Sequence, residues 1–244
     1  MSNKPGPDEI LDYIAKESLD AARHWPWVVA PLTRESGRAY ILQHVLRNRF
    51  FSSVMRPAWM SRCPDLAVVR KTISQMHEEL VLDPAIGAAH TKILFEMGRN
   101  TGLTDDQMNN VVAETSTAAS FAIQEKLARQ SHWTIGWLGS SIDEFVLTQL
   151  PGHNFEPRHW QDAYGLSIEE VFFFDYHLKA DLEHAGTSSW SMMQPHVTTA
   201  VCAEIVEALP LILESHRLFY VGVEAHTARM LEKWPHNKGD ARGN

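Results

Sequence analysis

The chain has little of what marks several large protein classes. It holds only two cysteines, Cys63 and Cys202, and no Cys-x-x-Cys pair, so a disulfide framework is excluded. No apolar run reaches the length of about 18 residues that a membrane-spanning helix needs. The first residues carry no apolar segment of the kind found in secretory signals, so a cytoplasmic protein is expected.

Positive charge is also scarce. Lys and Arg total 22 against 30 for Asp and Glu, which gives a net charge of −8. Proteins that bind nucleic acid usually present a basic face, so neither nucleic acid nor an anionic membrane is expected as a partner. Hydrophobic residues make up 44% and charged residues 21%, which excludes a disordered chain.

Strand patterns and long Gly/Pro/Ser linkers are nearly absent, whereas helical periodicity runs through most of the chain. We therefore predict one all-α domain over residues 1–244, a bundle of seven or eight helices with loose ends at 1–6 and 236–244. Pro210 is expected to kink or break the last helix. The predicted helices cover residues 7–22, 33–55, 65–82, 84–99, 104–130, 133–150, 156–163 (short), 167–184 and 194–233.

The sharpest motif lies in the predicted helix 167–184, which contains His177, Asp181 and His184. At about 100° per residue these side chains fall at roughly 0°, 40° and −20° around the helix axis. Two imidazoles and a carboxylate on one narrow face form a typical ligand set for a transition metal. A solvent-exposed polar face explains one such histidine more easily than three ligands in register.

Further candidate ligands lie on other predicted helices. Glu79 is weakly preferred to its neighbour Glu78, and Glu144 is preferred to Asp143 as a carboxylate that could bridge two cations. His90 follows two small alanines that leave room for a metal, although on its own it would be better explained as a buried structural histidine. Asp83, followed by Pro84, is best explained as a helix cap.

Taken together, Glu79, His90, Glu144 and the His-x3-Asp-x2-His motif resemble the haem-oxygenase-like di-iron oxidases and oxygenases. These enzymes share a helical fold with the TenA and PqqC proteins and with haem oxygenase. The resemblance covers about residues 30–230 and implies two Fe(II) ions, with Mn as the alternative metal and O2 as co-substrate. It implies that Glu79, His90 and His184 hold one iron, that His177 and Asp181 hold the other, and that Glu144 bridges them.

Related branches fit the residues less well. TenA-like thiaminases need an activated cysteine, which neither Cys63 nor Cys202 resembles. PqqC-like oxidases need no metal ligands, and a haem-binding His24 or His44 would leave the six candidate ligands unexplained. A metal-free TenA/PqqC-like enzyme and a non-catalytic helical binding protein remain the alternatives.

The resemblance implies oxidation of a small substrate in specialised metabolism, by N-oxygenation, desaturation or carbon–carbon cleavage. Arg47 or Arg49 could clamp a substrate carboxylate, although surface arginines paired with acids are equally expected. Trp137 could line an aromatic substrate pocket, although aromatic residues at helical spacing more often belong to the core. A free amino acid with an apolar or aromatic side chain is therefore favoured over a sugar or a phosphate. An electron donor and a second copy of the chain are further candidate partners.

Overall fold

The structure, a computed structural model, describes residues 5–147, 149–184 and 188–233. Within the helices, the side chains at positions 144, 145, 147, 180–184, 188 and 189 lie outside this description. The described residues are helical with no strand, apart from an isolated bridge between Asp83 and Ala88. The all-α prediction is therefore confirmed.

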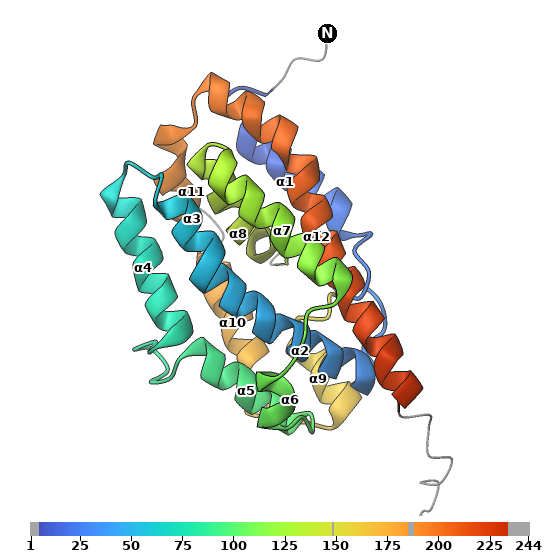
Figure 1. The fold of residues 1–244 in the computed structure, drawn as a ribbon. Coiled ribbons are helices and arrows are strands. Elements are labelled where there is room, and N and C mark those ends of the chain that lie inside the picture. Colours follow the sequence, from blue (N-terminus) through green and yellow to red (C-terminus); the bar gives the residue numbers. More distant parts are fainter. Residues whose placement is uncertain (1–4, 148, 185–187, 234–244) are drawn as a thin grey trace, which may run out of the picture.

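The helices follow one another in a bundle that Figure 1 shows from the side. In chain order they are α1 (Ile10–Ala22), α2 (Arg34–Phe50), a π-helical segment η1 (Phe51–Met55), α3 (Arg56–Met60), α4 (Leu66–Leu80), α5 (His90–Asn100), α6 (Asp105–Asn109), α7 (Thr115–Gln130), α8 (Trp133–Leu147), α9 (Pro157–Tyr164), α10 (Phe172–His184), α11 (Ser188–Met193), the 3-10 turn η2 (Gln194–His196) and α12 (Thr199–Lys233).

The centre of the bundle is built on α12, which packs most extensively against α7 and α2. In Figure 1, α7 and α12 lie side by side, while α4 stands at the edge of the bundle. α12 continues through Pro210, so of the two expected effects the break of the helix does not occur. Pro210 is exposed, so the backbone carbonyl that loses its partner can bond to water instead.

An aromatic cluster fills the core beneath the pocket described below. Trp27 stacks on Tyr40 with ring centroids 4.2 Å apart, and Trp160 stacks on Phe174 at 4.3 Å. Phe155 meets both Trp27 and Tyr40 edge-on. Such pairs add about 0.5–1.5 kcal/mol each beyond the burial of their area, so the floor of the pocket is rigid.

No single helix within the described ranges has both the length and the apolar character needed to cross a bilayer. The bent pair Trp190–His196 and Thr199–Glu232 reaches these limits only when its two parts are taken together.

Three predicted helix boundaries away from the pocket were wrong. The predicted helix 104–130 is two helices, because the side chain of Gln43 binds the backbone at Val112 and Glu114 and holds the break open. Ser167 and Glu170 do exchange capping bonds, yet α10 begins only at Phe172. Residues 194–196 form a separate 3-10 turn before α12.

Two glycines of α8 allow close contact with neighbouring helices. A Cβ atom at Gly136 would lie 2.6 Å from the Cβ of Trp59 and 3.0 Å from the Cα of Ala128. A Cβ at Gly139 would meet only the terminal methyl of Met55, at 2.9 Å. The glycine at position 136 therefore serves the packing of α8 against its neighbours.

Gly136→Ala should lower the free energy of unfolding by about 1–3 kcal/mol, because the new methyl group meets backbone and the fixed base of a side chain. Gly139→Ala is the matched control. It should be near neutral, since the Met55 methyl can move and alanine gains about 1 kcal/mol of helix propensity. Urea unfolding of both variants measures the difference, and equal stabilities would contradict this packing.

Candidate metal centre

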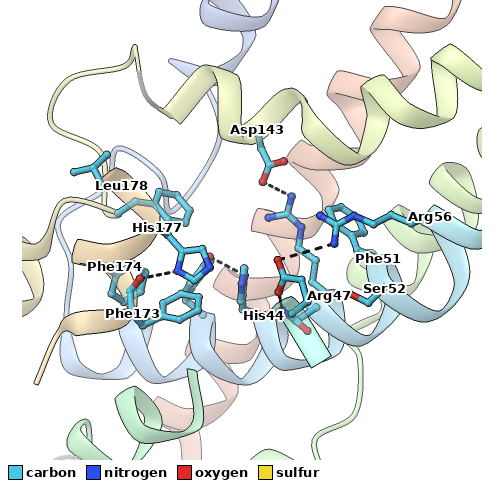
Figure 2. A pocket seen from close by; sticks show the side chains of 14 residues that line it. His44, Arg47, Phe51, Ser52, Arg56, Asp143, Phe173, Phe174, His177 and Leu178 are labelled. Atoms are coloured by element: carbon cyan, nitrogen blue, oxygen red, sulfur yellow. Dashed lines mark hydrogen bonds and ion pairs between the residues drawn. The ribbon is translucent and has the colours of Figure 1, made fainter. Parts of the chain in front are cut away.

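A cavity of about 90 Å³ lies between α2, η1, the end of α4, α8 and α10. Figure 2 shows His177 entering it from α10, Arg56 from the opposite side, and Asp143 from α8. Polar groups gather at one end and aromatic rings form much of the wall. The lining residues are Tyr40, His44, Arg47, Asn48, Phe51, Ser52, Arg56, Glu79, Asp143, Phe155, Phe173, Phe174, His177 and Leu178.

Because of the π-helical segment, side chains spaced four residues apart along α2, η1 and α3 all line the pocket. Four residues overshoot an α-helical turn by about 40°, so positions 44, 48, 52 and 56 would drift by about 120° around a regular helix. The wider turn of η1 takes up part of this drift, and all four residues line the pocket. Pro57, which cannot donate to the helix ladder, lies just after this turn. The helix predicted to end at residue 55 therefore continues without interruption through η1 and α3 to Met60, and that predicted end was wrong.

A tight turn links α4 to α5 and places two candidate ligands together. The helix predicted over residues 84–99 does not begin at residue 84, because Asp83 pairs with Ala88 and Gly87 adopts a left-handed conformation with φ of 67°. The helix starts at His90 instead. Asp83 caps this turn rather than a helix, since its Oδ1 accepts from the Ala85 N–H at 2.8 Å.

The second oxygen of Asp83 orients His90. Its Oδ2 lies 2.9 Å from His90 Nε2 and also accepts a hydrogen bond from the hydroxyl of Tyr176. With Nε2 engaged, the other nitrogen, Nδ1, faces Glu79 Oε1 at 3.5 Å. A carboxylate that holds one nitrogen of a histidine while the other nitrogen binds the ion is the usual arrangement around a protein-bound metal.

His177 is held in the same way by backbone. Its Nδ1–H donates to the carbonyl of Phe173 at 2.7 Å, which leaves Nε2 as the nitrogen with a free lone pair. Burial is the main cause that lowers the pKa of His177 to about 4. The imidazole is therefore neutral at pH 7, as a metal ligand must be.

Glu79 is fixed from two sides. Its Oε2 accepts from Asn48 Nδ2 at 2.6 Å, and Arg56 Nη1 lies 3.9 Å from its Oε1. Burial opposes ionisation, but His90 and Arg56 outweigh it and lower the pKa of Glu79. The neighbouring Glu78 points elsewhere and accepts from the Ser74 hydroxyl at 3.2 Å.

Donor atoms of Glu79, His90 and His177 all lie within 4.8 Å of one another. Two ligands about 2.1 Å from one ion are at most about 4.2 Å apart, so the set is slightly open. Burial opposes protonation of His90, but Glu79 and Asp83 outweigh it and raise its pKa to about 9. The imidazole is therefore protonated at pH 7, and a bound ion would have to displace the proton from its Nδ1. Buried His90 Nδ1 makes no hydrogen bond with any described residue. The residues present therefore fit a cation bound between these three side chains.

A buried ion pair forms the opposite wall. Arg47 donates to Asp143 Oδ2, and its guanidinium carbon lies over the rings of Phe51 and Phe219, 4.7 and 4.8 Å from their centroids. Burial alone would raise the pKa of Asp143, but Arg47 holds it below its ordinary value. His216 donates from Nε2 to the carbonyl of Gly139 and presents Nδ1 at 3.4 Å from Arg47 Nη2.

The other sequence candidates lie in different places. Arg47 lines the pocket but already has a carboxylate partner, with which a substrate carboxylate would compete. Arg49 is exposed and contacts Asn109, and Trp137 packs on Trp190 away from the lining residues. Glu144 lies in α8, and Asp181 and His184 lie in α10, but their side chains are outside the described part of the chain.

Sequence reasoning missed four residues that shape the site: Asp83, Tyr176, Asn48 and Arg56. Tyr176 directly precedes His177, and Asn48 and Arg56 follow His44 at intervals of four residues. Those spacings were the available signals. Asp83 was noticed only as a helix cap, whereas it caps a turn and orients His90.

Asp143→Ala should lower the free energy of unfolding by about 3–5 kcal/mol, because it leaves a buried guanidinium without its partner. The double variant with Arg47→Met should recover much of this loss. Glu125→Ala, which breaks the exposed pair with Arg129, is the control and should cost about 0.3–0.5 kcal/mol. Urea unfolding of wild type, Asp143→Ala, Arg47→Met, the double variant and Glu125→Ala measures these changes, and simple additivity of the two buried substitutions would refute the coupling.

Neither models of known protein families nor curated proteins gave a match to this chain.

Proposed function

We propose that this chain is a non-haem di-iron enzyme that uses O2 to oxidise a small carboxylate substrate, such as a free amino acid with an apolar or aromatic side chain. One observation carries the proposal. Donor atoms of Glu79, His90 and His177, which come from three helices, lie within 4.8 Å of one another, and Glu79 and His177 also line the cavity. The haem-oxygenase-like resemblance of the motif supports two irons rather than one.

The proximity of His177 to Glu79 and His90 favours a changed pairing. These three residues would hold the first iron, whereas the resemblance alone pairs His184 with Glu79 and His90. Asp181, His184 and the bridging Glu144 would serve the second iron. Iron with carboxylate and imidazole ligands supplies the electrons for reducing O2.

The protein's own residues orient the candidate ligands. Asn48 fixes the carboxylate of Glu79, Asp83 fixes His90, and the Phe173 carbonyl fixes His177. Phe155, Phe173 and Phe174 supply the apolar wall beside them.

Glu79→Gln tests the site against its neighbour Glu78→Gln. In an anaerobic Fe(II) titration of metal-free protein, wild type and Glu78→Gln should both bind two Fe(II) per chain. Glu79→Gln should weaken binding by at least the roughly 10–100-fold that loss of an outer partner costs. Fe(II)-dependent O2 consumption should fall with it. Equal titrations for the two variants, or no stoichiometric Fe(II) binding by wild type, would overturn the proposal.

Asp83→Asn tests the outer support of His90. The amide keeps the size of the side chain but removes its charge, so Fe(II) affinity should fall by about 10–100-fold. Circular dichroism should show unchanged helix content. Asp65→Asn is the control, because Asp65 also pairs with a histidine, His196, but not with one of the candidate ligands. An unaltered Fe(II) affinity in Asp83→Asn would exclude this role.

A further inference from the structure

His44 is a polar side chain of the pocket that neither the candidate metal ligands nor the buried ion pair uses. It lines the cavity on the same row as Asn48 and Ser52. Its one hydrogen bond within the described part of the chain joins Nδ1 to the hydroxyl of Tyr40, at 2.7 Å. The other ring nitrogen, Nε2, points away from this bond and is left for an occupant of the cavity.

The surroundings of His44 place it between the two polar groups of the pocket. Figure 2 shows it between His177 and Arg47. The charged or titratable groups that act on it are Arg47, His177, Glu79 and Asp143, and all four also line the cavity. A ligand that contacts His44 therefore lies close to the candidate metal ligands as well.

Strained backbone supports the ring of Tyr40. Trp27 has a φ of 62°, a left-handed conformation that is costly for a bulky residue. Its indole stacks on Tyr40 with ring centroids 4.2 Å apart and planes 5° apart, and its Nε1 donates to the Ser36 carbonyl at 3.1 Å. Such strain persists where surrounding contacts over-determine it, and it gathers at functional sites. Here it places a buried ring against the residue that holds His44.

The bond to Tyr40 selects the tautomer of His44. Tyrosine brings an O–H donor, and a neutral imidazole has one nitrogen that accepts and one that donates. When Tyr40 donates to Nδ1, the proton of the ring lies on Nε2. Burial is the main cause that lowers the pKa of His44 to about 3, so the ring is neutral at pH 7. It then presents a single N–H donor to the cavity.

The reverse tautomer would leave a lone pair on Nε2, as a metal ligand needs. Among the described residues, however, the donor atoms that gather within 4.8 Å of one another belong to Glu79, His90 and His177, and His44 is not in this group. A role as hydrogen-bond donor therefore fits His44 better than a role as a ligand of that ion.

An enclosed donor costs free energy unless an acceptor pairs with it. The cavity of about 90 Å³ has room for several waters or one small organic molecule, since a water needs roughly 10–15 Å³ on this measure. Carboxylate and carbonyl oxygens accept hydrogen bonds from N–H groups. The chemistry that would recognise His44 is thus an oxygen acceptor carried by a small molecule.

We propose that His44, held by Tyr40 as the Nε2–H tautomer, donates a hydrogen bond to a carboxylate or carbonyl oxygen of a small molecule in this cavity. That this molecule is the oxidised substrate rests on the proposed function. The hydrogen bond itself does not, because His44 is not one of the candidate metal ligands.

Nitrogen NMR of the isotope-labelled, metal-free full chain tests the tautomer. Protonated and unprotonated ring nitrogens give separate signals, and the spectrum of His44→Gln identifies those of His44. We expect the proton on Nε2 at pH 7 in wild type. In Tyr40→Phe, which lacks the phenol donor, Nδ1 should gain part of the protonation. A wild-type ring protonated on Nδ1 would overturn the proposal.

Calorimetry with isovalerate and with isovaleramide tests the hydrogen bond, in metal-free and in anaerobic Fe(II)-treated protein. The two probes share an oxygen acceptor and an apolar group but differ in charge, and we expect at least one to bind. His44→Phe should weaken isovalerate about tenfold or more and isovaleramide about twofold to tenfold, the ranges for charged and neutral acceptors. His44→Gln, whose amide nitrogen can replace Nε2, should recover most of the loss.

His24→Phe is the control, because His24 is exposed and lies away from the cavity lining. It should leave probe binding unchanged. In wild type, the bound probe should shift the Nε2 signal of His44 and leave the signals of His24 in place, a readout that needs no variant at the site. Absence of that shift, binding of neither probe, or equal losses in His44→Phe and His44→Gln would each refute the hydrogen bond.

The outcome is separable from that of the proposed function. Probe binding that depends on His44 without stoichiometric Fe(II) binding would keep this contact and reject the di-iron enzyme. Two Fe(II) per chain with probe binding that is indifferent to His44 would do the reverse.

Discussion

The carboxylate of Asp83 connects the three segments that carry the candidate metal ligands. One oxygen caps the turn between α4 and α5, and the other holds His90 and receives the hydroxyl of Tyr176 on α10. Glu79 lies just before this turn, and His177 directly follows Tyr176. If Asp83 lost its charge, the turn, the orientation of His90 and the docking of α10 would all be affected together.

Burying charged side chains in this pocket costs solvation free energy, and two sets of contacts offset that cost. Arg47 and Asp143 pair with each other, and Arg47 also lies between two aromatic rings. Glu79 is flanked by Arg56, Asn48 and His90. A buried ion pair is often no more stable than apolar residues of the same volume. Stability alone therefore does not explain why the Arg47–Asp143 pair is buried.

Most of the fold could be predicted because its signal is local. Helical periodicity and the capping residue Thr104 are signals that lie within a few positions of the elements that they define. Errors arose where a distant contact decided the outcome. Gln43 interrupts the helix predicted over residues 104–130, and a π turn carries the second helix past the point where Pro57 suggested an end.

The site shows the same division. Helix geometry alone predicts that His177, Asp181 and His184 share one face of a helix. Glu79 was preferred to Glu78, and in the structure Glu79 contacts Asn48 whereas Glu78 contacts Ser74. Asp83-Pro84 looks like a helix start in sequence, and only the pairing of Asp83 with Ala88 across the turn shows otherwise. Arg47 and Asp143 are 96 positions apart, so no local pattern could reveal that they neutralise each other.

The central claim is that Glu79, His90 and His177 bind one ion. Crystals soaked anaerobically with Fe(II), with diffraction recorded on either side of the iron absorption edge, would test it most directly. An anomalous peak bounded by Glu79 Oε1, His90 Nδ1 and His177 Nε2 is the predicted result. Iron bound only at surface sites, with His90 Nδ1 still facing Glu79 and no peak between them, would contradict it.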